Sequence, residues 1–331
     1  MALIIGMDEA GYGPNLGPLV VGATAWEVTG DPRKVDLWQA FSGVVDQSPP
    51  VDGSHVQVAD SKQVYTPSKG LDNLEQGVLH ALALLRRCQS GEVEPCADPQ
   101  GDAPIPENFR ELFGQTAIQP LATLDTEPWF HDSNLTLPAA RQLPLSNRWL
   151  ERCREHSIRL RAIRSDVVLT RRFNDHARAH NSKGQALSEI TMNLLRHVWH
   201  ECDADAHESV LILADKHGGR NRYHDFLPAV FGDRFIRCLA ESGESSRYSV
   251  GNAEIRFETK SERHLPVALA SMVCKYLREL SMKLFNRFWA ERQPGLKPTA
   301  GYPVDAGRFR GEIAALQKQL AIADDNFWRE R

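Results

Sequence analysis

Residues 3–21 read LIIGMDEAGYGPNLGPLVV, and this stretch decides the fold that we expect for the chain. Short apolar runs at residues 3–7 and 19–26 enclose a segment rich in glycine and proline, which turn the chain. The pattern predicts a strand, a loop and a second strand, with Asp8 and Glu9 where the first strand ends. Adjacent strand residues point to opposite faces, so these two acids share a ligand only where the backbone bends. The glycines that follow permit such a bend.

The rest of the chain mixes strand and helix patterns. Apolar runs predict three more strands, at residues 54–59, 158–168 and 209–214. Apolar residues at helical spacing predict helices at residues 71–87, 187–199, 267–288 and 306–321. This order favours an α/β fold in which helices flank a mixed central sheet, antiparallel in its N-terminal part and parallel later.

The middle of the sequence carries a weaker pattern. Residues 90–106 hold many proline, glycine and acidic residues, which predict a loop, and the Pro-rich character continues to about residue 150. We expect a single domain over residues 1–331, with an insertion of unclear structure at approximately 90–150 and a C-terminal helical region at approximately 290–331.

Composition limits the class of protein. The 331 residues are 42% apolar, which is enough for a sizeable core, and the net charge of −4 neither indicates nor excludes a nucleic-acid partner. No run approaches the roughly 20 apolar residues of a membrane span. The N-terminus lacks the basic flank of a signal peptide, and the six cysteines form no CxxC pair. Reduced thiols in a cytoplasmic protein are therefore expected.

Carboxylates recur at positions where an α/β fold places ligands. Asp215 follows the predicted strand 209–214, and Glu279 lies on the predicted helix 267–288. Taken singly, each is as well explained by an exposed turn or a solvated helix charge. Several carboxylates brought to one place repel each other unless a hard cation relieves the repulsion. Mg²⁺ and Mn²⁺ prefer such oxygen ligands, and two ions can activate a water for attack at phosphorus.

Several segments resemble the motifs of the ribonuclease HII/HIII family. Residues 6–21, GMDEAGYGPNLGPLVV, resemble the opening motif G-x-D-E-A-G-R-G-P-x-x-G-P-V-V, and residues 60–62 resemble D-S-K. Phe173-Asn174 and the helix after it are similar to the segment before the next acidic strand. Residues 270–279, ASMVCKYLRE, resemble A-S-I-x-A-K-x-x-R-D, and Gly301-Tyr302 is similar to a late G-Y. The motifs keep the family's order over nearly the whole chain, except roughly residues 90–150.

The resemblance implies a ribonuclease H-like fold and an endonuclease that hydrolyses the RNA strand, or embedded ribonucleotides, in RNA–DNA duplexes. It implies Mg²⁺ or Mn²⁺ in a two-ion site as the cofactor. The catalytic and metal-binding residues implied are Asp8, Glu9, Asp215 and Glu279. The substrate-binding residues implied are Gly11, Tyr12, Gly13, Ser61, Lys62, Lys275 and Tyr302.

Three departures from the family pattern bear on the substrate. Tyr12 stands where the family has the arginine of G-R-G, which removes a bidentate phosphate contact. The amides of the flanking glycines can still approach a 2′-hydroxyl. Glu279 stands for an aspartate, as in ribonuclease HIII, and Lys216 stands for a glycine. These departures leave open whether single ribonucleotides or long hybrids are preferred, and whether Tyr12 replaces the arginine.

Basic and imidazole side chains suggest further contacts. The loop at residues 216–222, KHGGRNR, could hold phosphate, and His217 could pass a proton to the leaving group. The arginine-rich stretch at residues 148–172 could follow a duplex backbone and make binding salt-dependent. A surface turn with incidental charge explains the loop equally well, whereas for the arginine-rich stretch we favour the functional interpretation over a solvated basic surface. His197 and His200 are better explained by packing than by zinc.

Alternative functions are kept for comparison. The glycines at 11, 13 and 17 superficially resemble a dinucleotide-binding loop, but the spacing differs by one and prolines interrupt the helix that should follow. The neighbouring Asp8 and Glu9 would also repel a pyrophosphate. A ribonuclease H-like protein that binds nucleic acid without catalysis, or one that acts on DNA, remains the main alternative.

Overall fold

The computed structural model describes residues 1–51, 53–90, 105–131, 135–137 and 143–330. The loop predicted at residues 90–106 lies almost wholly outside them. The described part of the middle segment contains α4 (Phe109–Thr116), η1 (Leu121–Thr126), η2 (Pro128–Phe130) and α5 (Leu145–Glu155). The sequence predicted none of these elements.

A seven-stranded sheet crosses the molecule in the order β5-β2-β1-β6-β9-β8-β7. Its strands are β1 (Ala2–Ala10), β2 (Leu19–Val28), β5 (Arg159–Val168), β6 (Ser209–Asp215), β7 (Ile236–Glu241), β8 (Ser245–Val250) and β9 (Ala253–Glu258). β1 pairs antiparallel with β2 and parallel with β6, β2 pairs antiparallel with β5, and β6 pairs parallel with β9. The mixed sheet with an antiparallel N-terminal part is therefore confirmed.

The part of the sheet beyond β6 was not predicted. β8 pairs antiparallel with both β7 and β9, which adds three strands that the sequence analysis missed. Conversely, the strand predicted at residues 54–59 is reduced to β4 (Val56–Gln57), which pairs only with β3 (Val45–Asp46).

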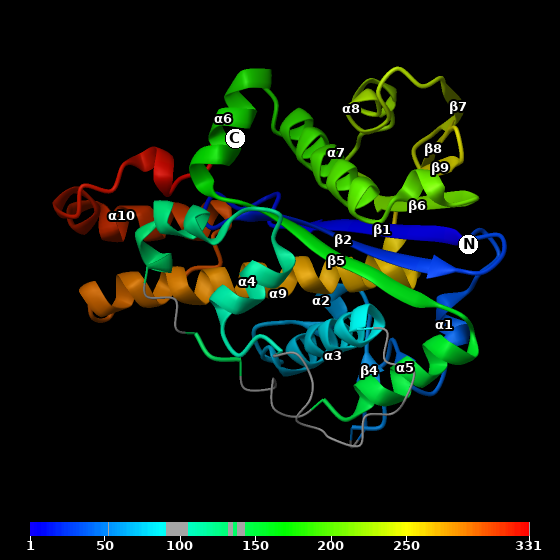
Figure 1. Ribbon diagram of the computed structural model, residues 1–331. Coiled ribbons are helices and arrows are strands. Elements are labelled where there is room, and N and C mark those ends of the chain that lie inside the picture. The colour runs from blue at the N-terminus through cyan, green and yellow to red at the C-terminus, as the bar shows by residue number, and fades with distance from the viewer. Residues whose placement is uncertain (52, 91–104, 132–134, 138–142, 331) are drawn as a thin grey trace.

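Helices cover both faces of the sheet, as Figure 1 shows. α6 (Thr170–His180), α7 (Lys183–Glu201) and the short α8 (Pro228–Phe231) lie on one side. On the other side lie α9 (Leu265–Arg292), α3 (Asp72–Ser90) and α5. The remaining helices are α1 (Leu37–Ala40), α2 (Ser61–Val64), α10 (Pro303–Gln319), η4 (Ala204–Ala206), η5 (His224–Phe226), η6 (Ser261–Arg263) and η7 (Asp324–Asn326). The predicted α/β class with a mixed central sheet flanked by helices is confirmed.

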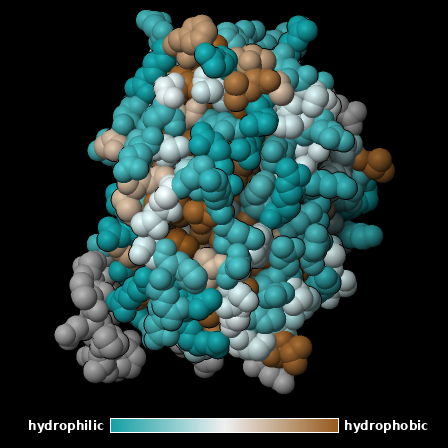
Figure 2. All heavy atoms as spheres, turned by 90° about the vertical axis from the view of Figure 1, so that its right-hand side faces the viewer, coloured by the Kyte–Doolittle hydropathy of each residue, from teal (hydrophilic) through white to brown (hydrophobic). Residues whose placement is uncertain are grey.

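The strand β1 supplies side chains to a core on each side of the sheet. Ile4 packs with the residues of α3 and α9, while Leu3 and Ile5 pack with those of α7. A strand buried on both faces requires a continuous apolar run, which is why β1 was readable from sequence. Within the described part of the chain, no helix has the length and apolar character needed to cross a membrane. Figure 2 shows a face on which hydrophilic side chains predominate.

Two glycines let α9 lie directly against the strands that carry the site. A Cβ on Gly6 would come within 2.3 Å of the Pro266 backbone, and one on Gly22 within 2.6 Å of the Cys274 sulfur. Only glycine permits so close an approach of helix to strand. The register of α9 against β1 is thereby set, and this register positions the side chains of α9 relative to Asp8.

Candidate metal centre

Three predicted acids meet where β1 and β6 end. The two strands are parallel and pair Met7 with Ala214, so Asp8 and Asp215 follow at the next position on adjacent strands. Neighbouring strands lie about 4.8 Å apart, and residues at matching positions share a face. Glu9 is the next residue of β1. The carboxyl ends of parallel strands are where α/β sheets bind ligands, and here that edge carries acids.

A fourth carboxylate comes from η6, which the sequence analysis did not identify. The Ser261 amide donates to Oδ1 of Asp215 at 3.2 Å, and the Ser261 hydroxyl donates to the carbonyl of Ala214 at 3.0 Å. These bonds attach η6 to the end of β6 and bring Glu262 to the centre. Its negative charge raises the pKa of Asp8, Glu9 and Asp215.

Burial and mutual repulsion both oppose the ionised form of these acids. Burial, followed by the charge of Asp215, raises the pKa of Asp8 to about 8, while a hydrogen bond from Ser271 works against this. The pKa of Asp215 rises to about 6, first through burial and then through Glu262. Burial and the charge of Asp8 also raise the pKa of Glu9. Charge uncompensated in this way is what a bound cation would stabilise.

Lys62 is the cation that acts on this centre. Asp60 accepts from the Lys62 amide at 3.0 Å and so caps α2, which carries Lys62. Burial works to lower the pKa of Lys62, but the negative charges of Asp60, Glu262, Asp8 and Asp215 raise it. One lysine against four carboxylates leaves a net negative site.

The carboxylates of the centre are spread more widely than the ligands of a single ion. In the described residues, no three of them have oxygens within 4.8 Å of one another. Repulsion between like charges accounts for such a spread, and two ions about 4 Å apart accommodate a wider ligand set than one ion does. All donors are oxygens, which fits Mg²⁺ or Mn²⁺.

The structure does not bring Glu279 to the centre. Its carboxylate accepts from the Tyr65 hydroxyl at 2.9 Å and from Lys275 Nζ at 2.6 Å. Ser271, which bonds Asp8, lies eight residues earlier on α9, a rise of roughly 12 Å along the helix. Glu279 and Lys275 therefore form an ion pair of their own, with Lys275 Nζ 4.8 Å from the Tyr65 ring centroid. The fourth acid whose charge acts on Asp8, Glu9 and Asp215 is Glu262.

The glycine loop between β1 and β2 is held by two buried arginines. Arg278 donates to the carbonyls of Pro18 at 2.5 Å and Leu16 at 3.1 Å, while Arg329 donates to those of Gly11 at 2.6 Å and Pro14 at 2.5 Å. Gly11 adopts a φ of +90°, which other residues rarely adopt. Burial lowers the pKa of Arg278 to about 10, because it disfavours the charged guanidinium. The hydrogen bonds to the loop carbonyls offset part of this cost.

Tyr12 lies between the acids and two cations. Lys183 Nζ is 5.4 Å from its ring centroid. Burial and the charge of Glu9 raise the pKa of the Tyr12 hydroxyl, while Arg220 lowers it. Tyr302 is 55% exposed, and a Cβ on Gly13 would come within 4.0 Å of its ring. The structure therefore groups the predicted residues Gly11, Tyr12, Gly13 and Tyr302 around one loop.

Other predicted groups are engaged within the protein. Ser61 is buried, and its hydroxyl oxygen lies 3.0 Å from that of Ser271, within hydrogen-bonding distance. His217 is buried against the Ser188 hydroxyl at 2.9 Å, and burial lowers its pKa to about 3. A neutral, buried imidazole gives little support to proton transfer at neutral pH. Lys216 donates to Asn221 Oδ1 at 2.7 Å and to the Ser242 carbonyl at 2.5 Å.

The arginine-rich stretch at residues 148–172 is largely paired. Arg161 meets Glu27 at 3.3 Å, Arg164 meets Glu201 at 2.5 Å, and Arg172 meets Asp166 at 2.5 Å. These ion pairs favour a structural role over a continuous track for a duplex backbone.

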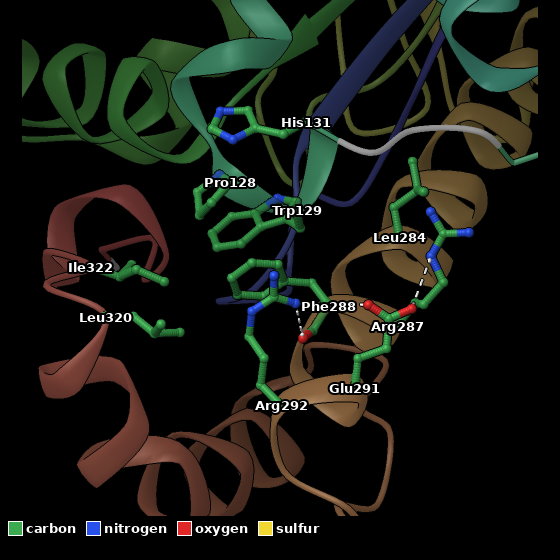
Figure 3. Close-up of a pocket in the computed structure, with 10 residues that line it drawn as sticks. All are labelled: Pro128, Trp129, His131, Leu284, Arg287, Phe288, Glu291, Arg292, Leu320 and Ile322. Atoms are coloured by element: carbon green, nitrogen blue, oxygen red, sulfur yellow. Dashed lines mark hydrogen bonds and ion pairs between the residues drawn. The ribbon is translucent and has the colours of Figure 1, made fainter.

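A separate hollow of about 310 Å³ lies between η2, the C-terminal half of α9 and residues 320–322 (Figure 3). Trp129 and Phe288 line it, and the Arg292 guanidinium lies 3.8 Å from the Phe288 ring centroid. It contains none of the predicted site residues, so the chemistry of the carboxylates, not the size of a hollow, defines the candidate site.

No protein-family model matches this sequence, and no curated protein does. Solved structures similar to the chain include ribonuclease H2 from Pyrococcus horikoshii OT3, which is 13% identical with a TM-score of 0.41. The match covers 98% of this chain and 92% of that one. RNase HII from Archaeoglobus fulgidus, in a complex with PCNA, is 16% identical with a TM-score of 0.38, and 99% and 94% of the chains are covered.

A third similar structure is Bst-RNase HIII in complex with Mn²⁺. It is 16% identical with a TM-score of 0.39, and the match covers 99% of this chain and 66% of that one. All three structures are named as ribonucleases H, and each match covers nearly the whole of this chain. Every one of these TM-scores is below 0.5.

Proposed function

We propose that this chain is a divalent-metal-dependent endonuclease that hydrolyses the RNA strand, or embedded ribonucleotides, in RNA–DNA duplexes. The observation that carries the proposal is the set of four acids at the ends of β1 and β6 and in η6, with Lys62 as the compensating cation. Their chemistry suits phosphodiester hydrolysis. The family motifs supply the substrate class.

The residues that would hold the metal are Asp8, Glu9, Asp215 and Glu262. When bound, two Mg²⁺ or Mn²⁺ ions activate the attacking water and stabilise the leaving oxygen. The ligand set fits such ions because all its donors are carboxylate oxygens, and because burial and the charges of neighbouring acids raise the pKa of Asp8, Glu9 and Asp215. Glu262 replaces Glu279 in this set, since Glu279 is paired with Lys275 and Tyr65.

Other side chains bind and orient the substrate. Lys62 is exposed beside the acids and is placed to contact a phosphate. The glycine loop presents backbone amides where a 2′-hydroxyl would lie, which distinguishes RNA from DNA. Arg278 and Arg329 hold this loop from beneath, and Tyr12 provides a ring for a sugar or base to stack on. Cleavage of a duplex that carries a single ribonucleotide tests whether these groups replace the phosphate contact of the family arginine.

The test is cleavage of two labelled duplexes with Mg²⁺ and with Mn²⁺. One duplex carries a single ribonucleotide in DNA, and the other is a continuous RNA–DNA hybrid. We expect cleavage of at least one of them, lost with chelator and in Asp8→Asn. Cleavage of the single-ribonucleotide duplex assigns the activity to the ribonuclease HII type despite Tyr12, and cleavage of the hybrid alone assigns it to the ribonuclease HIII type.

The opposing result is equally definite. If neither duplex is cut while the folded protein binds them and binds the metal, the chain is a nucleic-acid-binding relative without this activity. If only an all-DNA control duplex is cut, the enzyme is DNA-directed. Either outcome overturns the proposed function.

A further inference from the structure

A second group of metal-ligating side chains lies outside the carboxylate centre, where α6 packs on α7. His176 and His180 are four residues apart on α6, so they occupy the same face of that helix. Glu189 faces them from α7, the helix beside it in Figure 1. In the described part of the chain, this is the one group of three such residues whose ligand atoms all lie within 4.8 Å of one another.

Both imidazoles approach the same carboxylate oxygen. Oε2 of Glu189 lies 2.6 Å from Nε2 of His180 and 3.9 Å from Nδ1 of His176. An ordinary ion pair between His180 and Glu189 accounts for the shorter distance. It does not account for the second imidazole, whose Nδ1 lies 3.9 Å from that oxygen and which stands one helical turn earlier on α6. A shared cation accounts for all three placements.

The types of donor atom in this group favour zinc over a hard cation such as Mg²⁺. Two imidazole nitrogens with one carboxylate oxygen form the ligand set of several zinc sites, with a water in the fourth position. Ligand bonds of about 2.0–2.2 Å place tetrahedral donor atoms roughly 3.3 Å apart. The observed separations bracket that value. The three side chains are each about one-third exposed, so shifts of an ångström or less can close the set.

The surrounding charges favour a neutral imidazole and an available carboxylate. Burial, followed by the charge of Arg172, lowers the pKa of His176, which leaves its nitrogen lone pair free at neutral pH. Arg172 is itself paired with both oxygens of Asp166, at 2.5 and 2.8 Å. Its charge is therefore largely compensated and does not exclude a cation from the site.

We propose that His176, His180 and Glu189 form a zinc-binding site that joins α6 to α7. The site is separate from the carboxylate centre. On α7, Ser188 faces that centre's side through its bond to His217, and Glu189 points roughly 100° away around the helix. The site needs no nuclease activity to exist.

Zinc at this position would stabilise the turn between the two helices. That turn runs through Asn181, which adopts a φ of +49°, and leads directly into Lys183. Lys183 Nζ lies 5.4 Å from the Tyr12 ring centroid and 5.7 Å from that of Phe173. Zinc bound here would therefore stabilise the start of α7, which contacts Tyr12 of the glycine loop, without adding a ligand to the carboxylate centre.

The test is calorimetric titration of zinc chloride into chelator-treated full-length protein carrying Asp8→Asn, which weakens the competing centre. We expect binding with one ion per chain from this site. His176→Ala and His180→Ala should each weaken it roughly tenfold or more. His197→Ala is the matched control, because His197 also pairs with a glutamate on α7, at 3.8 Å from Glu201, but lacks a second imidazole.

Metal-dependent thermal unfolding gives a second readout. Zinc should raise the unfolding temperature of the parent and of His197→Ala, but not that of the two site variants, whose metal-free unfolding shows whether they fold. His176→Gln serves if His176→Ala fails to fold. Equal zinc binding in all variants would overturn the proposal. Loss only in His180→Ala would overturn the three-residue ligand set.

Discussion

Asp8 of β1 and Glu254 of β9 are both buried in the same sheet, at 8% and 6% exposure, but their surroundings differ. Glu254 accepts hydrogen bonds from Arg33 at 2.7 Å, Arg247 at 2.8 Å and Arg256 at 2.8 Å. Burial alone would raise its pKa, yet these three arginines lower it to about 2. Around Asp8, the nearest charges are other carboxylates, and its pKa rises to about 8.

The difference in surroundings distinguishes an acid that stabilises the fold from acids that are suited to bind a cation. The protein compensates Glu254 with its own guanidinium groups, so that acid stabilises the fold. At the end of β1, Lys62 is the lysine that lies beside the four acids, and its single charge does not balance theirs. Perturbed carboxylates of this kind concentrate at functional sites. Removing the charge of Asp8 should therefore lower activity and raise stability. Removing the charge of Glu254 should lower stability and leave activity unchanged.

The largest effect is expected for Asp8→Asn. Removing this ligand should lower the cleavage rate by about 10⁴-fold, as for other groups that act together in catalysis. In chelator, however, the variant should unfold at a higher temperature than the parent, because folding no longer has to bury the Asp8 charge or neutralise it with a proton. Cleavage assays and thermal unfolding check the two halves. A variant that is less stable and still active would contradict the assignment.

The next effect distinguishes the fourth carboxylate. Glu262→Gln should lower the cleavage rate by about 10³-fold, since it removes one of the four charges that would hold the ions. Glu279→Gln, the matched control, should lower it far less, because Glu279 bonds Tyr65 and Lys275 instead. The rates are compared at saturating Mn²⁺. The reverse order of effects would restore Glu279 to the ligand set.

Glu127 sharpens the comparison, because it is a buried acid whose hydrogen-bond donors are neutral groups, and the charge of Arg329 has only a smaller effect on its pKa. It accepts from the Thr170 amide at 2.9 Å and the Trp129 indole at 2.8 Å, and burial raises its pKa to about 7. The folded protein thus holds this proton more tightly than the unfolded chain, whose glutamate titrates near 4.5.

The stability that Glu127 contributes is therefore full below about pH 4.5 and is lost as the pH rises through 7, a fall of about 3 kcal/mol. Glu127→Gln should remove this fall and leave cleavage unchanged. Urea unfolding at pH 5 and pH 8 measures it. An unchanged pH dependence in the variant would show that the proton is not held in the folded state.

Glu254→Gln should give the smallest effect and the opposite sign. Its lowered pKa means that the stabilisation is present above about pH 4.5 and lost as the pH falls through about 2. The substitution should cost about 2 kcal/mol at pH 7, allowing for the partial exposure of the arginines, with no loss of cleavage. Urea unfolding at pH 7 and pH 3 should show the difference shrinking in acid. A loss of activity without a loss of stability would contradict the structural role.

Long apolar runs were the part of the fold that could be predicted. They gave β1, β2, β5, β6, α3, α7 and α9, and with them the positions of Asp8, Glu9 and Asp215. The strands β7, β8 and β9 were missed because their sequences, IRCLAE, SSRYSV and AEIRFE, are short and are interrupted by charged or hydroxyl side chains, so none contains a long apolar run. Without β9, the segment that follows it could not be placed.

Glu262 was missed for that reason. It lies in η6, directly between β9 and α9, and only the pairing of β9 with β6 brings it beside Asp215. Glu279 was chosen from a motif, whereas its distance from Asp8 depends on how α9 is set against β1. Gly6 and Gly22 determine that register through contacts with Pro266 and Cys274, which no periodicity reveals. The arginine clamps on Glu254 likewise join residues distant in sequence.

The most direct test of the account is calorimetric titration of Mn²⁺ into the parent, Asp8→Asn and Glu254→Gln. The parent and Glu254→Gln should bind the metal alike, because Glu254 is already satisfied by three arginines, while Asp8→Asn should bind roughly tenfold or more weakly. Equal binding by all three proteins would contradict the claim that the unpaired acids at the end of β1 form the metal centre.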